Sequence, residues 1–117
     1  MKTSELIDLA LDWAVAKCEG YEYNIESGLL YKFKEPHFFK PYSTDWSQGG
    51  PIIEREWINI SRAALGGWVS TLFDDTAELL ENSFKFRQYG PTPLIAAMRC
   101  YVASKLGEEI DVPKELL

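Results

Sequence analysis

The fifteen residues Tyr42–Glu56 constrain the fold more than any other stretch, because they combine helix-capping residues, a tryptophan, two adjacent glycines and a proline. The pair Ser43-Thr44 is suited to cap a helix, and Asp45 in the first turn complements the positive end of the helix dipole. Gly49-Gly50 are expected to interrupt that helix, and Pro51 is expected to begin a second helical turn. We therefore predict a loop followed by a short helix in two parts.

An amphipathic pattern over Ser4–Lys17 predicts a helix near the start of the chain. Apolar residues recur there at helical spacing, and the charged residues, Asp12 among them, are expected to face outward. Thr3 or Ser4 can cap this helix, and Gly20 suits its left-handed end. Trp13 falls on the apolar stripe, so we expect it to anchor the core rather than bind a ligand.

A second apolar pattern predicts a long helix over Pro93–Leu106. Thr92 is its expected cap, the proline occupies the first turn, and Gly107 marks the stop. The small residues Ala96 and Ala97 would let this helix approach the sheet or another helix closely.

Period-two alternation predicts strands between the two helices. Tyr21–Lys34 is expected to form a hairpin that turns at Ser27-Gly28, because two short alternating runs flank a glycine-containing pair. Glu35–Tyr42 carries two prolines and is expected to be a connector without regular structure.

Three further strands are expected after the short helix. Trp57–Ser61 and Trp68–Phe73 are rich in strand formers, with a turn at Gly66-Gly67 between them, and Phe84–Arg87 alternates again. The acidic segment Asp74–Asn82 is expected to be a loop or one helical turn.

The order of these elements predicts an α+β fold. Residues 1–117 would form a single layered domain, in which an antiparallel sheet packs with N-terminal and C-terminal helices and a short central helix. The last ten residues, Glu108–Leu117, are expected to be a short polar tail.

The charge and cysteine content exclude several classes of function. A formal net charge of −6 argues against binding to DNA or RNA, which depends on neutralising phosphates. No apolar run is long enough to span a membrane, and acidic residues interrupt the only stretch resembling a signal peptide. Cys18 and Cys100 are expected to be buried thiols in a reducing compartment, without a disulfide or a zinc site. We expect a soluble, cytosolic protein that needs no cofactor or metal.

No catalytic constellation is visible in the sequence. His37 is the only histidine, and its neighbours Phe38-Phe39 favour a half-buried structural role. Ser43, Thr44 and Asp45 are adjacent but have no base at a motif spacing, and the Gly49-Gly50 pair lacks the lysine of a phosphate-binding loop. We therefore expect a protein that is not an enzyme.

Three segments resemble the NinX family of small proteins from lambdoid phages and prophages. They are Leu11–Gly20 (LDWAVAKCEG), Ser43–Glu56 with its Ser-Thr-Asp-Trp start, and Tyr89–Ala103 (YGPTPLIAAMRCYVA). The layout is also similar to a broader phage domain described as an α/β/α sandwich. The resemblance implies a protein that works in the cytoplasm of an infected bacterial host, in a family without an assigned biochemical function. Residues 57–88 match it least, and features particular to this chain are expected there.

Phage proteins that sequester nucleotide-derived immune signals suggest a ligand-binding hypothesis. Such a site needs aromatic rings for a base, arginines for phosphates and free backbone N–H groups. The candidate ligand-binding residues lie in the Ser43–Arg55 stretch and around the entrance to the last helix: Ser43, Thr44, Asp45, Trp46, Gln48, Gly49, Gly50, Arg55, Arg87, Tyr89, Thr92 and Arg99. Asp45 as a cap would repel an anion, Trp46 suits a core position equally, and Arg55 suits an ion pair with a neighbouring glutamate.

A protein–protein module is the alternative function. An acidic surface with exposed aromatic residues would bind and inhibit or modulate a host protein, with charge raising the association rate and aromatic contacts supplying affinity. Close packing through Ala96 and Ala97 would also suit a homo-oligomer, which we expect under either hypothesis. A ligand-binding protein should have a concave pocket lined by arginine and aromatic residues, and an inhibitor should have a flat exposed patch.

Overall fold

A computed structural model describes residues 1–73 and 84–117, and the element expected at 74–82 lies outside these residues. The helices are α1 (Asp8–Cys18), α2 (Trp46–Glu56) and α3 (Pro93–Leu106), with short 3-10 turns η1 (Thr3–Glu5) and η2 (Lys114–Leu116). The strands are β1 (Glu22–Asn24), β2 (Leu29–Lys32), β3 (Glu35–His37), β4 (Ile58–Arg62), β5 (Trp68–Phe73) and β6 (Phe84–Gly90). The α+β prediction is confirmed.

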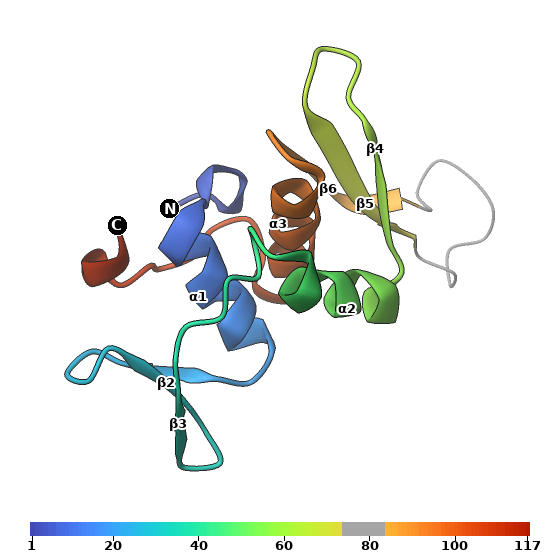
Figure 1. Ribbon diagram of the computed structural model, residues 1–117. Coiled ribbons are helices and arrows are strands. Elements are labelled where there is room, and N and C mark those ends of the chain that lie inside the picture. The colour runs from blue at the N-terminus through green and yellow to red at the C-terminus, as the bar shows by residue number, and fades with distance from the viewer. Residues whose placement is uncertain (74–83) are drawn as a thin grey trace.

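The strands divide into two antiparallel sheets, β1–β2–β3 and β4–β5–β6, rather than forming the single sheet expected. Figure 1 shows the two sheets at opposite ends of the molecule, with the helices between them. The long helix α3 packs against all three strands of the second sheet and against α1 and α2. Among the helices of the described residues, none is long and apolar enough to cross a bilayer.

Helix α3 is buried on nearly every side, which explains why its sequence is apolar almost throughout. Its bounds and its Thr92 cap agree with the prediction, and the Thr92 hydroxyl accepts a hydrogen bond from the Ile95 N–H at 3.1 Å. Close approach to the sheet is also confirmed, because a Cβ at Gly90 of β6 would stand 2.7 Å from the backbone nitrogen of Ala96. Ala96 and Ala97 are both 0 % exposed, so they are not available for a contact between two copies.

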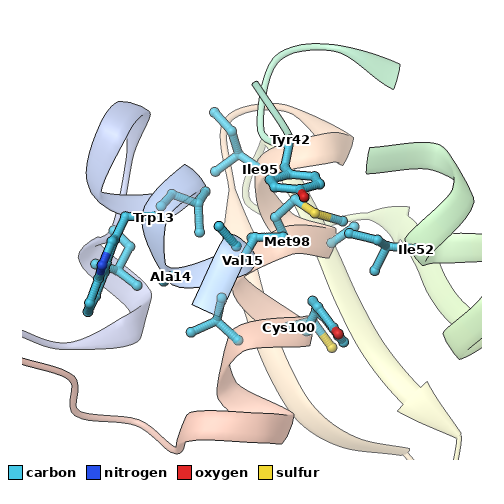
Figure 2. Packing of buried hydrophobic residues seen from close by; sticks show 14 of the residues in the cluster. Trp13, Ala14, Val15, Tyr42, Ile52, Ile95, Met98 and Cys100 are labelled. Carbon is cyan, nitrogen blue, oxygen red and sulfur yellow. The ribbon is translucent and has the colours of Figure 1, made fainter. Parts of the chain in front are cut away.

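The core joins α1, α2 and α3. Figure 2 shows Val15 of α1 beside Met98 of α3, near Ile95, Tyr42 and Ile52, whereas the Trp13 ring lies on the opposite side of α1. Trp13 is 7 % exposed, which confirms its place as a core anchor. Cys18 and Cys100 are free, and burial is the main cause that raises the pKa of each thiol to about 12.

The first helix begins later than its pattern predicts, and one of its charged residues is buried. Chain extension at Ile7 separates η1 from α1, and the Thr3 hydroxyl donates to the Gly107 carbonyl at 2.7 Å instead of capping a helix. Asp12 does not face outward: it is 7 % exposed, and its carboxylate accepts a hydrogen bond of 2.9 Å from the Ser43 N–H. The aspartate thus ties α1 to the loop before α2.

Asp12 supplies a pH-dependent prediction. Burial raises the pKa of its carboxyl, against the lowering effect of the hydrogen bond from the Ser43 N–H, so the folded-state pKa exceeds the unfolded one. A raised carboxyl pKa contributes stability in acid and loses it as pH rises through the folded-state value. Asp12→Asn keeps an acceptor for Ser43 and removes the buried charge, so it should raise the free energy of unfolding at pH 7.

Unfolding in urea at several pH values measures this effect. The gain from Asp12→Asn should be largest at neutral pH and should shrink as the pH falls through the raised folded-state pKa, because the wild-type carboxyl then takes up a proton. Asp12→Ala is the opposite control, because it leaves the Ser43 N–H without a partner and should cost about 1–3 kcal/mol. A destabilised Asn variant at pH 7 would show that the charge itself is needed.

Helix α2 departs from prediction in two ways. Asp45, not Ser43 or Thr44, is the cap, and its carboxylate accepts from the Ser47 N–H at 2.9 Å. The helix also runs unbroken through Gly49-Gly50 and Pro51 to Glu56. Buried Gly49 serves close packing rather than a break, because a Cβ there would stand 2.5 Å from the Tyr42 carbonyl oxygen.

The strand and turn predictions hold in part. The strand β5 has the predicted bounds, and the Gly66-Gly67 turn is confirmed. The tight two-residue turn lies at Phe33-Lys34, where both residues have positive φ, and a longer loop contains Ser27-Gly28. The connector expected over Glu35–Tyr42 begins with the strand β3, which pairs with β2.

The predictions for the start of β4 and for the C-terminal segment were also wrong. Trp57 is the left-handed end of α2 rather than the start of a strand, and it is exposed. The C-terminal segment is not a simple polar tail, since the Ile110 N–H donates to the Met1 carbonyl at 2.9 Å. Ile110 is buried, and Val112 and Leu116 pack against the core.

Candidate functional site

The sheet β4–β5–β6 has two faces of different character. Ile60, Ser70 and Gln88 lie opposite one another in register on the face toward α3. Because side chains alternate along a strand, the next row, which includes Ser61 and Tyr89, lies on the other face. Both of these side chains are exposed.

A bulge in β6 changes the alternation beside this row. Ser70 pairs with Gln88 but Leu72 pairs with Lys85, so β6 has one residue more than β5 across this interval. Phe86 takes the positive φ of 59° that accommodates it. The ladder resumes beyond the bulge at Leu72 and Lys85. Arg87 stands two residues before Tyr89, so both side chains lie exposed on the outer face of the sheet.

The residues around the end of β6 line an open groove of about 400 Å³. We call it the arginine groove, and its lining residues are Ser4, Gly66, Gly67, Arg87, Gln88, Tyr89, Gly90, Pro91 and Arg99. A second groove of about 310 Å³ on the outer sheet face shares Arg87 and Tyr89 with it. Neither lining includes an aspartate or a glutamate among the described residues.

Arg99 projects from α3 and is held in one orientation by two backbone carbonyls. Its Nε donates to the Leu6 oxygen and its Nη1 donates to the Tyr89 oxygen, each at 2.8 Å. Burial lowers the pKa of the guanidinium, but an arginine remains charged at neutral pH. The two acceptors are uncharged, and within residues 1–73 and 84–117 no carboxylate forms an ion pair with Arg99.

Two further arginines near this sheet, Arg87 and Arg62, also form no ion pair with a carboxylate of the described residues. Arg87 is exposed, and within residues 1–73 and 84–117 it forms no ion pair. Arg62 lies over the Trp68 ring at 5.2 Å, a cation–π contact, and likewise has no ion pair in the described part of the chain. Three of the four arginines therefore gather around one sheet in a protein whose formal net charge is −6.

The fourth arginine, Arg55, is fully engaged elsewhere. It donates to both oxygens of Glu19, at 3.0 and 2.7 Å, and to Glu56 at 2.9 Å. Tyr101 donates to Glu19 at 2.5 Å and accepts from Arg55 at 3.1 Å. Burial alone would raise the Glu19 pKa, but the hydrogen bonds from Arg55 and Tyr101 outweigh it and lower the pKa. This network joins α1, α2 and α3 and leaves little of Arg55 for a phosphate.

The remaining candidate residues lie apart from the arginine groove. Ser43 and Gly49 are buried, whereas Thr44, Asp45 and Trp46 are exposed at the start of α2, with Trp46 53 % exposed. Gln48 instead lines a different groove beside β3. The Asp45 carboxylate occupies the N-terminus of α2, and hydrogen bonds from Ser47 lower its pKa, so this helix start already holds a negative charge.

Larger grooves, of about 570 and 510 Å³, lie around the sheet β1–β2–β3. Their linings are mostly aromatic and apolar, and the first balances Lys17 with Glu22. Among residues 1–73 and 84–117, no group of three or more His, Cys, Asp or Glu side chains could hold a metal ion. Arg87 and Arg99, which form no ion pair within the described residues, make the smaller arginine groove the better candidate site.

Sequence reasoning found Arg87, Tyr89 and Arg99 but missed their companions. Gln88 and Gly90 were not singled out, because the strand was expected to end at Arg87. The Gly66-Gly67 turn was predicted as a turn only, yet it closes one side of the groove, where a Cβ at Gly67 would stand 2.8 Å from the Gly90 oxygen. The sequence did offer one signal for these companions: the predicted turn implies a hairpin register that places Arg62 opposite Trp68.

Comparisons with known proteins identify a family for the chain and a solved structure with a similar fold. The family model described as "Bacteriophage P22, NinX" matches residues 2–105. A solved structure described as the 2.0 Å crystal structure of a phage protein from Bacillus cereus ATCC 14579 superimposes with a TM-score of 0.60. It is 14 % identical, and the match covers 95 % of this chain and 93 % of that chain, so the likeness shows the fold alone. No curated protein matches.

Proposed function

Because the chain belongs to the bacteriophage P22 NinX family, we propose that it is a non-enzymatic phage accessory protein that binds a small nucleotide-like ligand in the arginine groove. The observation that carries this proposal is the grouping of Arg87 and Arg99, neither with a carboxylate partner among the described residues, beside the exposed ring of Tyr89. A groove lined by positive charge in a protein of net charge −6 would attract an anionic ligand to this place on the surface.

Each groove residue has a role that suits such a ligand. Arg87 and the free side of the Arg99 guanidinium would meet the phosphate, since guanidinium groups match phosphate oxygens in geometry and charge. Tyr89 also offers a backbone donor: its carbonyl bonds to Arg99, and the N–H and C=O of one residue in an antiparallel strand point to the same side. Its exposed ring would stack on the base.

A nucleotide-derived signal of the host immune response would be bound and kept from its receptor, in the cytoplasm of the infected bacterium, without a chemical step. Phage membership supports this setting. The openness of the groove supports a homo-oligomer, because a second copy would enclose a ligand that one copy leaves exposed to solvent.

Titration calorimetry with adenosine 5′-monophosphate (AMP) tests the site. Wild-type protein should bind AMP, and Arg87→Ala should weaken binding roughly tenfold to a hundredfold, the value of a charged hydrogen bond. Raising the salt concentration should weaken wild-type binding more than it weakens the variant, because screening acts on the lost interaction.

Two control variants separate this site from general charge effects and from α2. Lys114→Gln removes an exposed positive charge on η2, outside the groove lining, and should leave the affinity unchanged. Trp46→Ala removes the exposed ring at the start of α2 and should also have no effect. Equal losses in Arg87→Ala and Lys114→Gln, or no AMP binding by the wild type, would refute the proposal.

A protein-binding role is the second candidate, and exposed aromatic side chains outside the arginine groove favour it. Phe33 and Phe38, beside the sheet β1–β2–β3, are 88 % and 84 % exposed. Trp57, at the end of α2, is 80 % exposed. Exposed aromatic side chains of this size commonly mark contact surfaces for proteins. Site-directed cross-linking from position 38 in infected cells would identify such a host partner.

A further inference from the structure

The strand β4 has a backbone edge that faces away from its sheet. Among the described strands, β5 is its only neighbour. The Ala63 N–H donates to the Gly67 carbonyl across the turn, and hydrogen-bonded pairs recur at every second residue of an antiparallel ladder. Counted back from Ala63, every second residue of β4 therefore bonds to β5. The residues between them direct their N–H and C=O groups outward, and they are Ile58, Ile60 and Arg62.

A bond on the far side of the sheet supports this count. It directs the N–H and C=O of Tyr89 to the outer edge of β6, and there the Tyr89 oxygen does accept a hydrogen bond from Arg99. The outward groups of β4, in contrast, form no hydrogen bond within residues 1–73 and 84–117.

The edge of β4 also lacks the features that usually prevent a strand from pairing with another chain. It is five residues long and pairs with β5 without a bulge, and it contains neither proline nor lysine. The edge strand β3 contains Pro36, and the edge strand β6 has a bulge. An open edge of this kind can add an extended segment as a further strand.

The side chains along β4 indicate what such a segment must carry. Ile58 is buried and Ile60 packs against the core, both on the face toward α3. Asn59 and Ser61 are exposed on the outer face. Arg62 is exposed and forms no ion pair in the described part of the chain. Residues directly opposite each other in an antiparallel pair share a face and touch.

We propose that the edge of β4 binds an extended acidic segment of another protein as an additional antiparallel strand. The segment carries a carboxylate opposite Arg62 and then alternates polar and apolar residues, with the apolar ones opposite Ile60 and Ile58. Charge complementarity selects this occupant, because the adjoining groove of the outer face is lined by two arginines and, among the described residues, by no aspartate or glutamate.

A second copy of the chain fits this edge less well. If two copies of β4 paired around Ile60, Arg62 of one copy would lie opposite Ile58 of the other, so neither arginine would gain a carboxylate. The inference does not depend on the nucleotide site, because no residue of β4 lines the arginine groove.

Amide NMR titration of the wild-type protein with the peptide acetyl-Glu-Thr-Val-Thr-Val-amide tests the proposal. Its glutamate would lie opposite Arg62 and its central valine opposite Ile60. The amide protons of Ile58, Ile60 and Arg62 should shift downfield as they gain acceptors, and those of Asn59 and Ser61, already bonded to β5, should shift less. Replacing the glutamate of the peptide with lysine should weaken binding roughly fivefold, and Arg62→Glu should reverse this preference.

A proline at position 60 tests the backbone contact. Ile60→Pro removes the outward N–H but no donor of the ladder with β5, and edge strands tolerate proline at such a position. It should weaken peptide binding about tenfold, whereas Ile60→Val keeps the N–H and should bind with nearly the wild-type affinity.

N-methylated peptides give the same test on the wild-type protein, should Ile60→Pro not fold. A methyl group on the nitrogen of the central valine, which faces Ile60, should abolish binding. The same group on the threonine before it, whose N–H points away from β4, should not.

The proposal would be overturned by an absence of these shifts at millimolar peptide, by equal affinity for the glutamate and lysine peptides, or by binding that survives methylation of the central valine. Shifts of the three outward amides when the wild-type protein is concentrated alone would overturn it too, since they would assign the edge to a second copy.

Discussion

Replacing Gly49 with alanine is expected to lower the free energy of unfolding by about 3 kcal/mol. Gly49 is buried inside α2, where a Cβ would stand 2.5 Å from the Tyr42 carbonyl oxygen and 2.6 Å from Leu94 Cδ1. The leucine can turn aside, but the backbone at Tyr42 cannot easily move. The Tyr42 side chain is buried in the core, and the next residue, Ser43, is bonded to Asp12.

The adjacent glycine provides the control. A Cβ at Gly50 would meet only Trp46, at 4.0 Å, and Gly50 lies in the same helix. Gly50→Ala should therefore stabilise the protein by roughly 0.5–1 kcal/mol, the ordinary gain from replacing a helical glycine. Urea unfolding followed by circular dichroism measures both variants. Equal effects of the two substitutions would mean that α2 does not pack on the Tyr42 loop as described.

Truncating Met98 to alanine should cost about 3 kcal/mol, because it opens a cavity where α1, α2 and α3 meet. Met98 is 0 % exposed. In the view of Figure 2, Val15 of α1 lies on one side of it and Ile52 of α2 on the other. A domain of this size has a total stability of about 5–15 kcal/mol, so the melting temperature should fall by roughly 10 °C or more.

Met98→Leu is the matched control for this cavity. It keeps the side-chain volume and should cost less than about 1.5 kcal/mol. Calorimetric melting of the two variants checks the difference. A Met98→Ala variant that melts with the wild type would show that this part of the core is loosely packed.

Local sequence signals predicted an element correctly where residues close together in the chain determine its conformation. Thr92, Pro93 and Gly107 mark the ends of α3, and the alternation in Trp68–Phe73 marks β5. These features depend on capping, proline geometry and period, all of which are readable over a few residues.

The predictions failed where contacts between residues distant in sequence determine the local structure. Gly49-Gly50 has the composition of a helix break, but Leu94 and Tyr42 require a residue without a side chain at Gly49. Asp12 looks like a solvated helix residue, yet a backbone N–H 31 positions away gives it a buried partner. Neither contact can be read from a helical pattern.

The candidate site was likewise predicted only in part from the sequence. Arg87, Tyr89 and Arg99 were predicted from residue type, and the structure brings them to one groove. Arg55 and Trp46 have equally suitable side chains, but Arg55 is held by Glu19 and Glu56, and Trp46 lies at the start of another helix. Residue chemistry selects candidates, and only the packing of α3 on β6 decides which of them meet.

The most direct test of the nucleotide site is an amide NMR titration of the wild-type protein with AMP. The largest shifts should fall on Gly66, Gly67, Tyr89 and Gly90, whose backbone groups line the arginine groove. The amides of Ser47–Gly50 in α2 should stay unchanged. Shifts confined to α2, or no shifts in the groove at millimolar AMP, would contradict the account.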